Sequence, residues 1–423
     1  MSSGEHFAYL AWRRRMRLIA GGAAVVVVGT AVVALNATAR RRWMASAPLP
    51  LLQQEAARNP GDLDLSFHVA YKLVQEGRAG EAYPTLQRLV KARPGSSTFW
   101  YGAARAASQQ GLAEEAVRGF RQAIALDGSP AAHAALAQIY ADAGLVTDAA
   151  AEYEQAVRRD PRVPVNRESW ARCLAAQGRL QEAWRIAEAA AEASPMLDGA
   201  YLVLGEIGPR LGRSLDAEFL LRRRINMTMA YPVAELRRAL VELLLKRPHT
   251  PELLAEAEDL MGWAVTDVDA ENFALVARVR MLRGNLQGAR QALRTGLEAN
   301  PEHPECHRLM AEVLRRLGDR QGAARHEARV PRPAEPDPGV ATLRKRASEP
   351  GAGAADHLRL AEALNRTGEP AEAAEACHRA LRLIPSSREA RALLERSRDE
   401  AIRHLQRLGR ERAAREAAAG GPP

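Results

Sequence analysis

Residues 97–129 have the sequence STFWYGAARAASQQGLAEEAVRGFRQAIALDGS. Apolar residues recur every three to four positions over residues 97–110 and again over residues 113–126, which is the spacing of amphipathic helices. Gly111 stands between the two segments, where a glycine in the left-handed conformation can end the first helix. The stretch therefore predicts two helices joined by a short turn.

The same pattern recurs along the chain with a period of about 34 residues. Glycines mark this period at Gly77, Gly111, Gly144, Gly178 and Gly212. Small alanines at fixed offsets, such as Ala116 and Ala149, let the two helices of a unit approach closely. Larger residues on the same period, such as Phe120 and Tyr153, are expected to fill the seam between neighbouring units. The chain is therefore predicted to be an all-α stack of helical hairpins.

These residues resemble the tetratricopeptide repeat (TPR) family. The resemblance rests on Trp100, Gly111, Ala116, Phe120 and Ala123 in the second unit, and on Leu136, Tyr140, Gly144, Ala149, Tyr153, Ala156 and Pro161 in the third. It covers most of residues 63–387. It implies an all-α fold, a right-handed α-α superhelical solenoid of about nine helix-turn-helix repeats.

Eight repeats are predicted within residues 63–330 and a ninth within residues 354–387. The predicted starts are Leu63, Ser97, Pro130, Pro164, Asp198, Arg238, Ala270, Pro304 and Ala354. The sixth repeat is degenerate, because a turn from Lys246 to Pro251 replaces its glycine. Residues 331–353 are rich in Pro and Gly and predict a linker, within which a short helix at 340–346 remains an alternative.

The two ends of the stack are predicted to be capped. Residues 40–62 are interpreted as a juxtamembrane segment followed by a capping helix at about 50–58. Residues 388–423 are interpreted as a polar carboxy-terminal capping helix and tail, which is the expected end of an open stack of repeats.

An uncharged stretch precedes the repeats. Leu18–Ala39 contains no charged residue, and at 1.5 Å per residue its length spans a hydrocarbon core of about 30 Å. Arginines flank it on both sides, and residues 1–17 form a short basic tail. We expect a transmembrane helix here. A cleaved signal peptide is the alternative, because Ala37-Thr38-Ala39 has the small-x-small form of a cleavage site.

The expected location is the inner, cytoplasmic membrane of a bacterium. The basic tail favours a cytoplasmic amino terminus, which places the repeats on the periplasmic side, although arginines on both flanks leave the opposite orientation open. Four Lys against 56 Arg, together with abundant Ala, suggest a GC-rich bacterial genome.

The net charge of +9 lies at the two ends of the chain. Residues 1–42 carry +6 and residues 386–423 carry +3, whereas the residues between them balance at 44 basic and 44 acidic side chains. A surface that neutralises phosphates needs clustered cations, so no nucleic-acid partner is expected.

No catalytic, cofactor-binding or metal site is predicted. The chain lacks the phosphate-binding glycine motifs and the nucleophile motif Gly-x-Ser-x-Gly, so an enzyme is not expected. Its three cysteines are far apart and are interpreted as ordinary thiols. His303, Cys306 and His307 lie close together, but a structural zinc site usually needs four ligands, so we interpret them as a solvated helix start.

Stacked hairpins form an extended concave surface from the first helix of each repeat, and such a surface can hold a peptide or a partner helix. Positions 2, 5, 9 and 12 of each unit lie on that face. The predicted peptide-binding groove contains Phe67, Tyr71, Tyr101, Arg105, Gln138, Glu168 and Arg172. Aromatic residues and Arg are enriched in interface hot spots. The alternative is that these side chains are only the solvated faces of helices.

The predicted function is a membrane-anchored protein–protein interaction scaffold or adaptor. Its partners would be proteins and, through Leu18–Ala39, the membrane. Two alternatives stay open: a structural assembly factor of the cell envelope that self-associates as a homo-oligomer, and a regulatory subunit of a separate enzyme.

Overall fold

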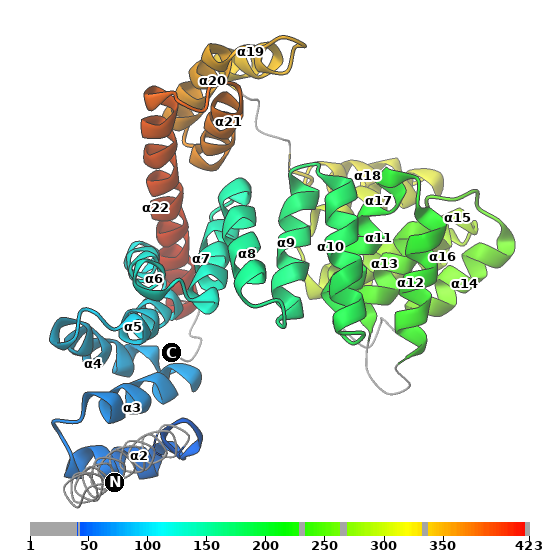
Figure 1. Cartoon of the computed structure of the whole chain (residues 1–423). Helices are drawn as coiled ribbons and strands as arrows, with labels where there is room; N and C mark the ends of the chain where they lie inside the picture. Colours follow the sequence, from blue (N-terminus) through cyan, green and yellow to red (C-terminus); the bar gives the residue numbers. More distant parts are fainter. Residues whose placement is uncertain (1–39, 41–42, 228–232, 263–268, 332–336, 419–423) are drawn as a thin grey trace, which may run out of the picture. The chain divides into compact units, whose positions relative to one another are not determined.

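The computed structural model describes residues 40, 43–227, 233–262, 269–331 and 337–418, and every regular element among them is a helix (Figure 1). The predicted basic tail and transmembrane segment, residues 1–17 and Leu18–Ala39, lie outside the described residues. Within the described part, no helix has both the length and the apolar character needed to cross a membrane.

The chain divides into two compact units, Met1–Leu126 and Asp127–Pro423. The helices of the first unit are α2 (Leu49–Arg58), α3 (Leu63–Gln75), α4 (Ala79–Ala92), α5 (Ser97–Gln109) and α6 (Ala113–Asp127, whose last residue begins the second unit). Asp62 and Ser96 begin α3 and α5 as amino-terminal caps, accepting hydrogen bonds from the N–H groups of Leu65 and Phe99. The sequence therefore starts each of these two first helices with a side chain that satisfies an otherwise unpaired donor.

The second unit continues the hairpins. Its elements are α7 (Pro130–Asp142), α8 (Val146–Arg159), α9 (Pro164–Ala176), α10 (Leu180–Ala193), α11 (Asp198–Ile207), the 3-10 helix η1 (Pro209–Leu211), α12 (Ser214–Asn226), α13 (Ala234–Leu244), α14 (Pro251–Gly262), α15 (Ala270–Leu282), α16 (Leu286–Ala299), α17 (Pro304–Arg316), α18 (Arg320–Glu327), α19 (Pro338–Ala347), α20 (Ala354–Thr367), α21 (Pro370–Leu383) and α22 (Arg388–Ala418). Helices begin at eight of the nine residues predicted as repeat starts. In the sixth repeat the first helix begins at Ala234, four residues before the predicted Arg238.

The periodic glycines end the first helices, as their spacing predicts. Gly111 has φ of 71°, and the N–H of Leu112 donates to the carbonyl of Ala107 (2.9 Å), which closes the last turn of α5. Because a side chain at this φ would meet its own backbone, glycine is the residue that suits the turn.

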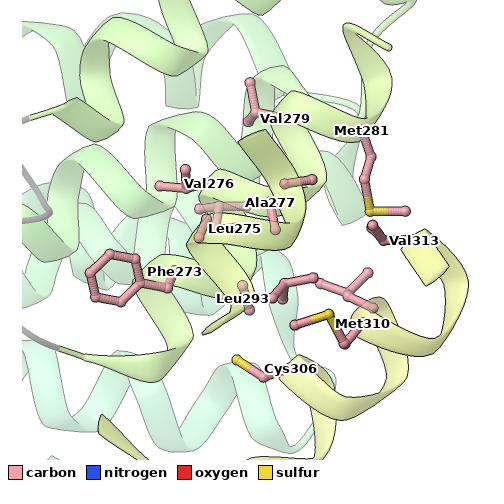
Figure 2. Packing of buried hydrophobic residues seen from close by; sticks show 14 of the residues in the cluster. Phe273, Leu275, Val276, Ala277, Val279, Met281, Leu293, Cys306, Met310 and Val313 are labelled. Carbon is pink, nitrogen blue, oxygen red and sulfur yellow. The ribbon is translucent and has the colours of Figure 1, made fainter. Parts of the chain in front are cut away.

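The core of each hairpin follows the alanine and large-residue pattern. Figure 2 shows this in the seventh and eighth repeats, where Phe273, Leu275 and Val276 of α15 are packed in one cluster with Leu293 of α16 and Met310 of α17. Alanines at the helix crossings are fully buried, and their small side chains let the helices approach closely.

Part of the predicted linker is folded. The helix α19 lies within residues 331–353 and packs against α20, with the side chain of Val340 only 2% exposed. The guanidinium of Arg346 forms an ion pair of 2.9 Å with Asp356 at the start of α20. The segment from residue 337 onward is therefore part of the packed carboxy-terminal hairpins.

The last helix has a buried stripe only along its first half. Ala390, Leu393, Leu394, Ala401 and Ile402 are buried, whereas residues 407–415 are exposed. The carboxy-terminal part of α22 is thus exposed to solvent over residues 407–415.

Candidate protein-binding surface on the first helices

Three of the predicted groove residues come together on α3 and α5. Tyr71 and Arg105 hold the same position in successive repeats, and Nη1 of Arg105 donates a hydrogen bond of 2.9 Å to the hydroxyl of Tyr71. The guanidinium carbon lies 5.7 Å from the centre of the Tyr71 ring, and the Tyr101 ring centre is 6.5 Å from the Tyr71 centre. All three side chains are partly exposed. We call Tyr71, Tyr101 and Arg105 the first-helix patch.

Phe67 supports this patch from below. Its side chain is 6% exposed, and its ring stacks on Tyr71 (5.5 Å between centres) and on Phe99 (5.3 Å). A Cβ on Gly102 would lie 2.6 Å from the Phe67 ring, so the ring occupies the space that this glycine leaves. Phe67 is therefore a core residue that positions Tyr71, and it offers little surface to a partner.

The charge of the first-helix patch is not compensated. Burial raises the pKa of the Tyr101 hydroxyl, with a further contribution from Tyr71, so this phenol stays protonated at neutral pH. Burial lowers the pKa of Arg105, but the neighbouring Tyr71 and Tyr101 outweigh it and the pKa lies above its ordinary value. No carboxylate in the described part of the chain forms an ion pair with Arg105. The patch can therefore donate hydrogen bonds to a carboxylate or a peptide carbonyl.

The other three predicted groove residues lie in the second unit and form local contacts. Exposed Gln138 donates to Asp142 (2.7 Å) and accepts from the Tyr153 hydroxyl (3.0 Å). Glu168 is buried, which raises its pKa, and it accepts a hydrogen bond of 2.5 Å from exposed Arg172. Glu168 is thus paired with a residue of its own helix.

The His303, Cys306 and His307 side chains have separate structural roles. His303 caps α17, with Nδ1 accepting from the N–H of Cys306 (3.2 Å). Nε2 of His307 contacts the carbonyl of Pro301 (2.9 Å), and its Nδ1 faces Nδ1 of His326 (2.8 Å). Cys306 Sγ points to the carbonyl of Ala270 (3.3 Å). Among the described residues there is no group of three or more side chains that could hold a metal ion.

A second hollow surface was not predicted from the sequence. It is a cavity of about 710 Å³ between α4 and α6, with α5 as its floor. The signal that could have indicated it is Gly119 in the middle of α6, opposite the consecutive small residues Ala103 and Ala104 of α5.

The helical hairpins match a known family over three stretches. Residues 73–139, 130–163 and 277–338 each match a family model described as tetratricopeptide repeat. The chain contains tetratricopeptide repeats. The first two stretches overlap and include α4 to α8, so Tyr101 and Arg105 of the first-helix patch lie within matched TPR sequence. Each of the two units thus contains helical hairpins that match the TPR family.

Solved structures give matches of low identity. A tetratricopeptide repeat protein from Parabacteroides merdae is 13% identical and covers 60% of this chain and 98% of its own, with a TM-score of 0.47. PilF of Pseudomonas aeruginosa is 19% identical over 52% of this chain and 99% of its own, with a TM-score of 0.43. YrrB, a TPR protein with an unusual peptide-binding site, is 17% identical over 42% of this chain and 90% of its own, with a TM-score of 0.33. No curated protein matches the chain in sequence.

Proposed function

We propose that this TPR protein is a membrane-anchored scaffold that binds a partner protein through the first-helix patch. The observation that carries the proposal is the uncompensated guanidinium of Arg105, held between Tyr71 and Tyr101 on the first helices of two successive repeats. Aromatic rings and an arginine with free donors are the side chains that dominate the energy of protein interfaces. The proposed role is binding and not catalysis.

The proposed occupant of the first-helix patch is an extended peptide or a helix of the partner that offers a carboxylate or carbonyl to Arg105. Two phenol rings beside the cation provide apolar contact area at low cost in side-chain entropy. Removing Arg105 should therefore weaken binding through lost hydrogen bonds, and removing either ring should weaken it through lost contact area.

The proposed anchor is Leu18–Ala39. Its support is the sequence alone: an uncharged stretch long enough to span a bilayer, with arginines on both flanks. The proposed location is a bacterial inner membrane with the repeats on the periplasmic side.

The binding proposal can be tested by site-specific cross-linking in living cells. A photoreactive amino acid replaces Tyr101 in one variant and the exposed Arg88 of α4 in a matched control. We expect a discrete cross-linked partner from position 101 and none of that size from position 88. Adding Arg105→Glu should abolish the product. A product that Arg105→Glu leaves unchanged contradicts the assignment of the patch.

The anchor is tested separately. The full chain should sediment with membranes, whereas a chain that begins at residue 40 should not. Two reporters fused to the carboxy terminus, one active only outside the cytoplasm and one only inside, then give the orientation. A homo-oligomer of residues 43–423 at micromolar concentration would instead favour the self-associating assembly factor.

A further inference from the structure

The cavity between α4 and α6 has an apolar floor built from small residues. A Cβ on Gly119 would lie 2.7 Å from the Cβ of Ala104, so α6 crosses α5 at a distance that only glycine allows. Ala103 and Ala104 continue this floor, and neither has a side chain long enough to fill the space above it. The result is a groove whose depth is set by three small residues.

Aromatic side chains form the walls of the groove. Tyr83 of α4 and Trp100 of α5 line it, and both are partly exposed. The indole N–H of Trp100 donates to the carbonyl of Pro94 (2.8 Å), which satisfies the polar atom of the ring. The remaining face of the indole is apolar surface available to a ligand.

The rim of the groove is basic. Lys91, Arg118 and Arg121 stand around it against a single acid, Glu115. Glu115 contacts Arg118 at 3.4 Å, and Lys91 forms no ion pair with any residue that the structure describes. A rim with a net positive charge around an apolar floor favours an apolar ligand that carries negative charges on its flanks.

We propose that this groove, on a face of α5 different from the first-helix patch, binds an amphipathic helix of a partner protein that has acidic residues on both sides of its apolar face. The α4 side of the groove runs from Tyr83 to Lys91, which at 1.5 Å per residue is about 12 Å and matches two turns of a helix. Apolar anchors at positions i, i+3, i+4 and i+7 of the partner would contact the floor, as in other helix-in-groove complexes.

The charge of the rim excludes the chain's own apolar segment as the occupant. Leu18–Ala39 is flanked by Arg17 on one side and by Arg40, Arg41 and Arg42 on the other. The segment itself contains no acidic residue and its nearest charges are these arginines, so it offers no negative charge to Lys91 and Arg118. The occupant is therefore a separate acidic helix.

The test uses two fluorescein-labelled peptides of about 18 residues, a length that supports some helix in isolation. Both carry leucines at i, i+3, i+4 and i+7. The acidic peptide has glutamates on both flanks of the apolar face, and the basic peptide has lysines in their place. Binding to the full chain in phosphatidylcholine nanodiscs is followed by fluorescence anisotropy, with empty nanodiscs as the blank.

We expect saturable binding of the acidic peptide and none of the basic peptide. The double variant Lys91→Glu and Arg118→Glu should weaken binding about tenfold or more, since both rim charges are reversed. Arg88→Glu is the matched control: it makes the same kind of charge reversal one turn away on α4, outside the groove, and should alter the affinity less than about twofold. Lys91, Arg118 and Arg88 are all exposed, so circular dichroism should show an unchanged fold.

Three results would overturn the proposal. They are no saturable binding to the wild type, equal binding of the two peptides, and an affinity that the Lys91 and Arg118 reversals leave unchanged. Arg105→Glu separates this site from the first-helix patch, because it should leave binding of the acidic peptide unaltered. Binding that is lost with Arg105→Glu but kept in the rim double variant places the peptide on the patch and also contradicts the groove.

Discussion

The carboxylate of Glu375 in α21 caps the first turn of α8 by accepting two hydrogen bonds from Thr147, 228 residues earlier in the chain. The N–H of Thr147 donates to Oε1 (2.8 Å) and its hydroxyl to Oε2 (2.6 Å). The first N–H groups of a helix have no partner within the helix, and the positive end of the helix dipole favours a carboxylate there. The ninth repeat is thereby joined to the edge of the third.

A buried ionic cluster lies beside this cap. Asp148 is 5% exposed, and its Oδ1 accepts hydrogen bonds from Nε2 of His378 (3.1 Å) and from a guanidinium nitrogen of Arg398 in α22. Burial raises the pKa of Asp148, but the hydrogen bonds from His378 and Arg398 outweigh burial, so the pKa lies below its ordinary 3.8. The contact between the two repeats therefore depends on paired charges.

Replacing Arg398 should weaken this contact. In Arg398→Ala the buried carboxylate of Asp148 keeps only His378 as a partner, and we expect the free energy of unfolding to fall by about 2 kcal/mol. Arg396→Ala on the same helix is the control, because Arg396 is exposed, and it should change stability by less than about 0.5 kcal/mol. Urea denaturation measures both. Equal losses in the two variants would show that Asp148 does not need this partner.

The three cysteines should be inert to thiol reagents in the native protein. Cys173, Cys306 and Cys377 are buried, and burial raises the pKa of each thiol to about 11. Reaction with a thiol reagent near neutral pH should therefore follow local opening. Mass spectrometry should find faster labelling of Cys377 in Arg398→Ala, with the rate at Cys306 unchanged. Acceleration at both cysteines would instead indicate that the whole second unit opens together.

Two glycines three residues apart should respond in opposite directions to alanine. Gly77 has φ of 79°, and no atom lies within 4 Å of the place that a Cβ would take, so Gly77→Ala should cost about 1 kcal/mol through backbone strain alone. Gly80 lies inside α4 with no atom within 4 Å of an added Cβ, so Gly80→Ala should stabilise by about 0.5 kcal/mol. Hydrogen exchange in α3 and α4 measures both effects. A loss of hydrogen-exchange protection in Gly80→Ala would contradict the prediction that alanine stabilises α4 at this position.

Acid should destabilise the eighth repeat through His326. Burial lowers the pKa of His326 below its ordinary 6.5, and the neighbouring His307, Arg329 and Arg325 lower it further. The folded chain thus favours the neutral imidazole, so this contribution to stability is fully present above pH 6.5 and is lost as the pH falls below 6.5 and through the lower pKa of His326 in the folded chain. The urea concentration at the denaturation midpoint should therefore decrease when the pH is lowered from about 7.5 to about 5.5.

The variant His326→Gln should make this fall smaller, whereas His404→Gln, at an exposed position of α22, should leave it unchanged. The fall should not vanish, because burial also lowers the pKa values of His68 and His357. If the denaturation midpoint of His326→Gln decreases on acidification as much as that of the wild type, His326 is not the group whose titration destabilises the repeat.

The hairpins could be predicted from the sequence because the first helices end at glycines that adopt positive φ, and this requirement repeats about every 34 residues. The sixth repeat lacks that glycine, and Leu245 to Thr250 form its turn, so the predicted start at Arg238 lies four residues too late. The linker prediction rests on Pro and Gly content, which cannot show that Val340 finds a buried place against α20.

The candidate surfaces can be predicted less completely. Helical geometry correctly groups Tyr71, Tyr101 and Arg105, because their register repeats with the hairpins. It also groups Phe67 with them, since it cannot show that Gly102 on the next repeat leaves a space for the ring. The link from Glu375 to Thr147 has no periodic signal, because it joins single polar residues of distant repeats.

The cap on α8 also has a consequence for synthesis of the protein. Thr147 and Asp148 leave the ribosome long before Glu375 and Arg398 are made, and at translation rates of roughly 5 to 20 residues per second the delay is on the order of 10 to 50 s. During that interval the carboxylate of Asp148 in the third repeat lacks the hydrogen bonds that His378 and Arg398 later donate to it. A residue translated 228 positions later thus completes the capping of a helix whose first turn is already made.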